Sequence, residues 1–165
     1  MFKTKLECSE SLAFNPGGVQ EVMMMDPSKP NDILLYLNMR KGFIRIALEY
    51  GAPVVPVFIF NYDGSYDWFL STKKFLAGLW RKLGFAPIFF TGRFGIPFFI
   101  PKPNKLHVVC GKPINIPKIS NSKTSKEDIQ TITDNYHAIF CQEMLSLYDR
   151  HKLDAGYDSH KVLVV

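Results

Sequence analysis

The fold is decided by one stretch in the first half of the chain, Arg40–Phe60 (RKGFIRIALEYGAPVVPVFIF). Its first part, up to Tyr50, has apolar residues at helical spacing, and Gly51 is a typical residue with which to end a helix. Its second part, Pro53–Phe60, is rich in β-branched and aromatic residues and predicts a buried strand. The apolar face expected for the helix consists of Phe43, Ile46, Ala47 and Tyr50.

An apolar run just before this stretch, Ile33–Leu37, predicts a second buried strand. A strand, a helix and a strand at this spacing favour parallel pairing. A chain of 165 residues is long enough for one domain with a core. We therefore expect a single α/β domain over residues 1–165, with a mainly parallel sheet and flanking helices.

The remaining elements follow from local patterns. Ser11–Phe14 predicts a strand that ends at a turn beginning with Asn15, Trp68–Leu83 predicts a helix, and Leu106–Cys110 predicts a further strand. Ser125 with Asp128 makes a capping box for a long last helix, which we expect to run to about Leu153 and to be closed by Gly156. Its expected apolar stripe is Ile129, Ile132, Tyr136, Ile139, Phe140 and Leu147.

The composition limits the kinds of partner that the chain could bind. A net charge of +5 suits an anionic partner, which by charge alone could be a phospholipid surface, the phosphates of coenzyme A or nucleic acid. The chain has 14 phenylalanines, and these abundant residues sit mainly in apolar runs rather than alternating with Lys and Arg, so we predict no nucleic-acid binding. The sequence leaves the oligomeric state open.

The cysteines and the apolar segments give no indication of a disulfide framework, a zinc site or a transmembrane helix. Cys8, Cys110 and Cys141 are far apart and form no C-x-x-C pair, so neither a disulfide framework nor a zinc site is indicated. No run of 18 or more residues is free of charges and helix breakers, so the sequence encodes no transmembrane helix.

The motifs in Arg40–Phe60 point to a family. They run in the order Arg-x-Gly-Phe, an alanine, a glycine, and then Val-Pro followed by an aromatic residue, and a Pro-Gly-Gly-x-x-Glu block precedes them at Pro16–Glu21. Together they resemble the type-2 diacylglycerol acyltransferase family. One departure is that Phe60 is followed by Asn61-Tyr62-Asp63-Gly64, whereas the family commonly has Gly-Glu-Asn at that point.

The resemblance implies a glycerolipid-acyltransferase-like fold and an acyl transfer from acyl-CoA to diacylglycerol or monoacylglycerol. That reaction requires no metal and no cofactor beyond acyl-CoA as a substrate. It also implies a location on the cytosolic face of the endoplasmic reticulum membrane or at lipid droplets. Members of the family carry a membrane hairpin and a catalytic His-Pro-His-Gly tetrapeptide further towards the N-terminus, so we expect this chain to be N-terminally incomplete.

Nine residues are predicted to bind substrate. Consecutive glycines let backbone N–H groups approach a phosphate or an oxyanion, although such a pair also marks an ordinary turn. Two cations at a helix start could bind the phosphates of coenzyme A or simply face water. Gly42 and Phe43 also suit packing, because a small residue would let the helix approach the sheet. Together with these patterns, the resemblance implies that the substrate-binding residues are Gly17, Gly18, Glu21, Arg40, Lys41, Gly42, Phe43, Val55 and Pro56.

Two segments are predicted to contact a membrane surface. Trp68–Leu83 combines aromatic and basic residues, and the Phe-rich segment 85–100 is too interrupted by Gly and Pro to span a bilayer as a helix. Trp and Phe would enter the headgroup boundary, and Lys would reach lipid phosphates. The alternative is that the Phe-rich segment simply forms core.

The base for acyl transfer is not evident. None of the four histidines, His107, His137, His151 and His160, is followed by Pro-His-Gly or by an aspartate at the spacing of the related His-x4-Asp motif. We therefore assign no catalytic residue in this chain. The alternative function is a non-catalytic acyl-CoA- or lipid-binding protein at the membrane surface, a truncated relative that has lost the base.

Overall fold

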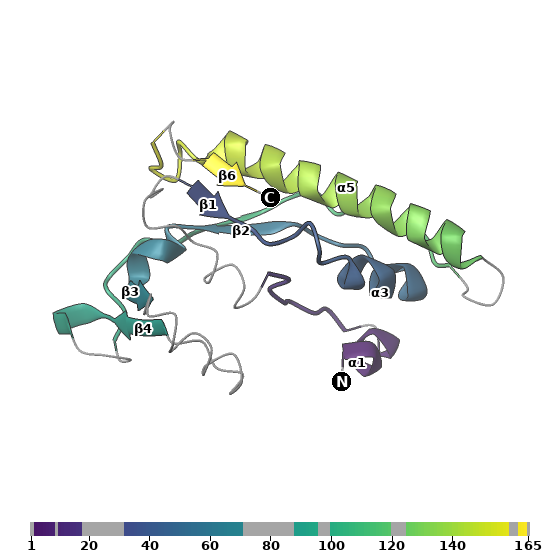
Figure 1. Ribbon diagram of the computed structural model, residues 1–165, viewed down its shortest axis with the longest axis horizontal. Coiled ribbons are helices and arrows are strands. Elements are labelled where there is room, and N and C mark those ends of the chain that lie inside the picture. The colour runs from purple at the N-terminus through teal and green to yellow at the C-terminus, as the bar shows by residue number, and fades with distance from the viewer. Residues whose placement is uncertain are drawn as a thin grey trace. The chain divides into compact units, whose positions relative to one another are not determined.

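The structure is a computed structural model, and it forms a mixed α/β fold with short two-stranded sheets (Figure 1). The chain divides into two compact units, Met1–Phe58 with Val109–Val165, and Ile59–Val108. The structure describes residues 2–8, 10–17, 32–70, 88–95, 100–119, 125–158 and 162–164.

The helix predicted in the deciding stretch is confirmed as α3, Gly42–Tyr50, which begins at Gly42 rather than at Arg40. It ends at Gly51, whose φ of 68° is in the left-handed region that favours glycine. Its buried face is Ile44, Ala47 and Leu48, so only Ala47 was expected correctly. Phe43 also packs on α5 through Phe140 but is only half-buried, because it and Ile46 line a cavity.

The last helix is confirmed as α5, Lys126–His151, although it ends before Leu153. Ser125 is its N-cap, and its Oγ accepts a hydrogen bond from the Asp128 N–H at 3.1 Å, as the capping box predicts. Gly156, with φ of 83°, lies in the turn that follows. The residues that α5 buries are Thr133, His137, Phe140, Met144, Leu147 and Tyr148.

Of the apolar stripe predicted for α5, Phe140 and Leu147 are buried, Ile129, Ile132 and Tyr136 are half-buried, and Ile139 is exposed. The prediction missed two polar residues that take core positions. Thr133 Oγ1 donates to the Ile129 carbonyl at 2.7 Å, and a ring nitrogen of His137 lies 3.0 Å from the Leu37 carbonyl oxygen. A polar side chain with such a partner can be buried at little cost.

The core of the first unit lies between α3 and α5. The Phe43 and Phe140 rings pack edge to face at 5.0 Å, and Phe58 of β2 packs edge to face on Tyr148 at 5.3 Å. A short N-terminal helix, α1 (Phe2–Glu7), contacts α3, and Lys3 Nζ lies 2.8 Å from the Glu49 carboxylate. The Asn15–Gly17 turn therefore belongs to the same compact unit as α3 and α5.

Parallel pairing is confined, among the described residues, to β1 (Asp32–Leu34) with β6 (Val162–Val164). The prediction of a mainly parallel sheet is therefore wrong. The strand β2, Val57–Phe60, is confirmed but pairs with β5, His107–Cys110, and not with β1. Before β2, Val54 forms an antiparallel bridge with Ile114, which brings a later segment to the position expected for β1.

In the second unit, β3 (Asp67–Leu70) pairs antiparallel with β4 (Ile88–Thr91). The helix predicted for Trp68–Leu83 is thus wrong for its first three residues, because Trp68 pairs with Phe90 and Phe69 with Phe89 in this hairpin. Residues 71–83 lie outside the described residues. Aromatic residues are enriched in strands, and here this preference outweighs the helical spacing.

Two further findings concern the segments singled out from the sequence. Ser11–Phe14, expected as a strand, has no regular structure, so this prediction is wrong. None of the helices within the described ranges is long and apolar enough to cross a membrane.

Candidate functional site

The candidate site surrounds the start of α3. Lys41 occupies the N-cap position of this helix with an α-helical backbone and makes no side-chain cap. Its Nζ lies 2.8 Å from Asp134 Oδ1 on α5. The hydrogen bond from Lys41 is the largest cause of the lowered pKa of the Asp134 carboxyl. Burial opposes it, and the positive charge of Lys41 and a hydrogen bond from Gln130 lower the pKa further. This ion pair fixes the start of α3 against α5.

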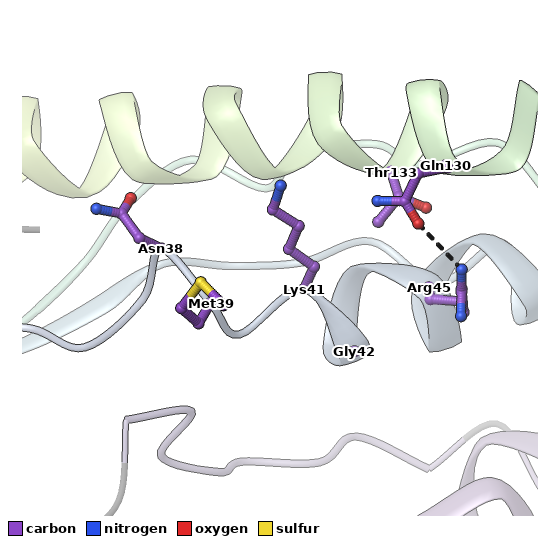
Figure 2. Close-up of a pocket in the computed structure, with 7 residues that line it drawn as sticks. All are labelled: Asn38, Met39, Lys41, Gly42, Arg45, Gln130 and Thr133. Atoms are coloured by element: carbon purple, nitrogen blue, oxygen red, sulfur yellow. Dashed lines mark hydrogen bonds between the residues drawn. The ribbon is translucent and has the colours of Figure 1, made fainter. Parts of the chain in front are cut away.

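A polar cavity of about 320 Å³ opens beside this ion pair (Figure 2). The Lys41 side chain extends from the start of α3 towards α5, and Arg45 Nη2 donates to Gln130 Oε1 at 3.2 Å. Two cations from α3 thus face polar side chains from α5. The residues that line this polar cavity are Asn38, Met39, Lys41, Gly42, Arg45, Gln130 and Thr133.

A second cavity, of about 370 Å³, lies against the N-terminal segment and is mainly apolar. The Phe14 and Phe43 rings lie 5.6 Å apart, and the Gly17 N–H donates to Asn15 Oδ1 at 3.1 Å, which shapes the turn at the end of that segment. The residues that line this apolar cavity are Phe14, Asn15, Pro16, Met39, Arg40, Gly42, Phe43 and Ile46.

The structure brings four predicted residues together, Arg40, Lys41, Gly42 and Phe43, all at the start of α3. The glycine turn reaches the same region through Asn15 and Pro16, while Gly17 is buried beside them and lines neither cavity. Gly18 and Glu21 lie outside the described residues.

Val55 and Pro56 lie apart from both cavities. Val55 is exposed, and Pro56 is buried with its carbonyl accepting the Gly111 N–H at 2.8 Å. The packing role expected for Gly42 is also wrong, because a side-chain Cβ built there meets no atom within 4 Å. The helix does not use Gly42 to approach a neighbour.

Several lining residues were not predicted from the sequence, above all Phe14, Arg45 and Gln130. Arg45 follows Lys41 by one helical turn, so that the spacing gave a usable signal that both cations share a face. Gln130 carries no such signal, because nothing local shows that its part of α5 would lie against α3.

Two of the described histidines, His107 and His137, are engaged in packing. His137 is 5% exposed and held on the Leu37 carbonyl, and the His107 ring packs edge to face with Phe60 at 6.0 Å. Cys141 Sγ lies 3.8 Å from His137 Nε2, but burial raises the pKa of this thiol. The thiol is therefore protonated at neutral pH and is a poor nucleophile.

These features define a mixed α/β chain with two chemically different cavities that meet at one helix start. The sequence model of the family described as diacylglycerol acyltransferase matches residues 3–165. The chain therefore belongs to the diacylglycerol acyltransferase family. No solved structure gives a significant match to it.

Three relatives illustrate the similarity. Diacylglycerol O-acyltransferase 1 of Eremothecium gossypii is 34% identical over 170 residues, covering 97% of this chain and 35% of that protein. Human acyl-CoA wax alcohol acyltransferase 1 is 35% identical over 148 residues, 85% of this chain and 42% of that protein. Diacylglycerol O-acyltransferase 2 of Danio rerio is 32% identical over 162 residues, 90% of this chain and 41% of that protein. The chain thus spans less than half the length of these relatives.

Proposed function

We propose that this chain supplies the acyl-donor-binding part of an O-acyltransferase of neutral lipid synthesis. The reaction transfers an acyl group from acyl-CoA to diacylglycerol or monoacylglycerol, giving triacylglycerol or diacylglycerol. The acceptor hydroxyl attacks the thioester carbonyl, the carbon–sulfur bond breaks, and coenzyme A leaves with the proton that a general base has taken from the hydroxyl.

One observation carries this proposal, namely that a cationic cavity adjoins an apolar cavity at the start of α3. Acyl-CoA combines phosphate groups with a hydrocarbon chain, and these need cationic hydrogen-bond donors and apolar walls respectively. Of the two residues shared by the cavities, Met39 and Gly42, Gly42 belongs to the motif through which the chain resembles its family. The names of the relatives, which specify diacylglycerol and wax alcohol as acceptors, support an acylglycerol or alcohol acceptor.

The proposal predicts binding without turnover for the chain as written, because the sequence contains no His-Pro-His-Gly. Loss of a general base commonly costs about 10²–10⁴-fold in rate. We expect calorimetry to detect acyl-CoA binding, and an assay with labelled acyl-CoA and diacylglycerol to detect no transfer above background. Turnover that disappears in His107→Ala would instead assign the base to His107.

A chimera tests the transfer itself. In it, this chain replaces the matching part of the Eremothecium gossypii relative, which then supplies the rest of that protein. Acyl transfer by the chimera supports the proposed function. A folded chimera without activity, together with tight acyl-CoA binding by this chain, supports the second candidate, a non-catalytic acyl-CoA-binding protein. The engagement of His107 and His137 in packing favours that candidate.

We also propose that the chain works at a membrane surface, on the cytosolic face of the endoplasmic reticulum or at lipid droplets. Phe94 follows β4 in a short turn and is 78% exposed, with Arg93 5.0 Å from its ring. The Arg93 N–H donates to the Ile100 carbonyl at 2.8 Å and closes the base of the loop. Phe94 has a φ of 67°, a conformation that is costly for a bulky residue and is typical of functional positions.

Vesicle flotation tests this contact. We expect the protein to float with vesicles containing anionic lipid, and Phe94→Ser to weaken flotation more than Tyr62→Ser, a matched change at an aromatic residue that is 72% exposed in the same unit. Phe94→Gly should weaken flotation while raising stability, because glycine tolerates the left-handed conformation. Equal recovery of the parent protein in the soluble fraction with and without vesicles contradicts the proposal.

A further inference from the structure

Gly42 is a glycine that the fold does not require. A Cβ built on it meets no atom within 4 Å, and its φ is not positive. Each of the other glycines whose surroundings the structure describes has a positive φ, a close neighbour of its built Cβ, or both. Gly51 has a positive φ and Gly111 has Pro56 and Leu147 within 3 Å of the built Cβ, for example. The open space at Gly42 therefore calls for an explanation outside folding.

The space lies where the two cavities meet. Gly42 and Met39 line both of them, and Met39 is 74% exposed. On one side of Gly42 the walls carry the cations Lys41 and Arg45, and on the other side they carry the aromatic rings of Phe14 and Phe43. Gly42 is exposed, and a side chain at this position would meet open space next to both cavities.

The two cations of the polar cavity, Lys41 and Arg45, differ in whether a carboxylate neutralises their charge. Lys41 shares its charge with the Asp134 carboxylate at 2.8 Å, whereas the described partner of Arg45 is the neutral carboxamide of Gln130 at 3.2 Å. None of the ion pairs found among the described residues includes Arg45. Arg45 therefore retains the charge and the donor geometry for a phosphate group, which a guanidinium binds through paired hydrogen bonds.

We propose that acyl-CoA binds across Gly42, with a phosphate-bearing part of coenzyme A in the polar cavity at Arg45 and the acyl chain in the apolar cavity that Phe14 and Phe43 help to line. Gly42 is then a positioning residue, since its missing side chain leaves room for the thioester linkage. This inference rests on the proposed function and adds the path of the donor through the site.

Binding measurements on the whole chain separate the two halves of the ligand. The probes are octanoyl-CoA, dodecanoyl-CoA, free coenzyme A and lauroyl lysophosphatidate, titrated calorimetrically below their micelle concentrations. We expect affinity to rise up to about fourfold for each added CH₂ of the acyl chain, the gain for full burial of a methylene. Tighter binding of lysophosphatidate than of dodecanoyl-CoA would overturn the assignment to the acyl donor.

Variants then test the path. Gly42→Leu should weaken dodecanoyl-CoA at least tenfold and change free coenzyme A by less than twofold, because the leucine blocks the passage but not the polar cavity. Arg45→Gln should weaken both ligands about tenfold or more, the effect of losing a hydrogen bond to a charged group. Ala138→Leu, which adds a leucine at an exposed position of α5, is the matched control and should change neither.

Phe14→Ala gives a second route to the same answer if Gly42→Leu does not fold. Phe14 lies outside the helices, and its loss should weaken dodecanoyl-CoA but not free coenzyme A. Parent-like binding of dodecanoyl-CoA by folded Gly42→Leu or by Phe14→Ala overturns the path across Gly42 and leaves the proposed function standing. If the parent chain binds no acyl-CoA, the proposed function fails together with the path.

Discussion

The two ends of α3 both carry a glycine, but for opposite reasons. At the C-terminal end, Gly51 has a φ of 68°, and a Cβ built on it would lie 2.8 Å from Lys118 Cβ. The backbone closes tightly there, because the Ile119 N–H donates to the Leu48 carbonyl at 2.8 Å. At the N-terminal end, Gly42 has neither a positive φ nor a close neighbour, and two cavities open around it.

The comparison shows that a glycine in a motif can serve either the fold or a ligand, and that its surroundings tell which. Gly51 is needed because no other residue would fit the backbone and the packing. Gly42 leaves space that the protein itself does not fill. Substitution should therefore damage stability at one end of α3 and ligand binding at the other.

The largest effect is expected for Gly51→Ala. A left-handed conformation costs a residue with a Cβ about 1–2 kcal/mol, and the close contact with Lys118 adds to this. We expect the free energy of unfolding to fall by about 2 kcal/mol in urea denaturation. Gly156→Ala is the control, because Gly156 has a φ of 83° but no atom within 4 Å of its built Cβ. Equal losses in the two variants would show that contact with Lys118 contributes nothing.

The next effect concerns how the two helices begin. Ser125 caps α5 through the Asp128 N–H, whereas Lys41 provides no side-chain cap for α3. Ser125→Ala should therefore lower the free energy of unfolding by about 1 kcal/mol. The comparison variant Lys41→Ala should cost less, because it removes an exposed ion pair and no cap. Thermal denaturation of both variants checks which one is less stable. A greater loss of stability in Lys41→Ala would show that Lys41 stabilises the start of α3 more than Ser125 stabilises the start of α5.

Gly42→Ala should change stability in the direction opposite to Gly51→Ala. Alanine loses less conformational freedom than glycine when a helix forms, and its methyl group meets open space. We expect the free energy of unfolding to rise by about 0.5 kcal/mol, the low end of the range for replacing glycine by alanine in a helix. The low end applies because residue 42 is in the first turn. A clear loss of stability would mean that the start of α3 is more tightly packed than its surroundings indicate.

The smallest effect is expected for the pH dependence of stability from the ion pair at the N-terminal end of α3. Lys41 holds the pKa of Asp134 below its ordinary value of 3.8, so the stability from this ion pair is present above that pH and is lost as the pH falls through the lowered pKa. Asp134→Asn should therefore be less stable than the parent protein at pH 7 and equally stable at about pH 2. A stability difference that persists at the lower pH would assign the role of Asp134 to packing.

Local signals predicted local features well. The end of α3 at Gly51 and the cap of α5 at Ser125 depend on residues within one turn of the chain, and both were read from the sequence. The motif residues Arg40 to Phe43 were also expected at the site, since they adjoin one another. Their division between a polar and an apolar cavity was not, because it depends on which faces of α3 meet α5 and the N-terminal segment.

Features that depend on distant partners could not be predicted. The strand β6, Val-Leu-Val, is too short to show a periodicity, and its partner β1 is far away in sequence. Burial of His137 depends on a carbonyl that belongs to Leu37, far away in sequence. For Trp68 to Leu70 the helical spacing was misleading, since a cross-strand partner in β4 decided the structure.

The pairing of β1 with β6 also sets an order of events during synthesis of the protein. Residues 162–164 pair with residues 32–34, and the Leu35 N–H donates to the Val164 carbonyl at 2.8 Å. A ribosome adds about 5–20 residues per second, so β1 waits on the order of ten seconds for its partner. During that time its backbone groups must be satisfied by water or by a chaperone. The α3–α5 core can form before this strand pair, because both helices are synthesised before β6.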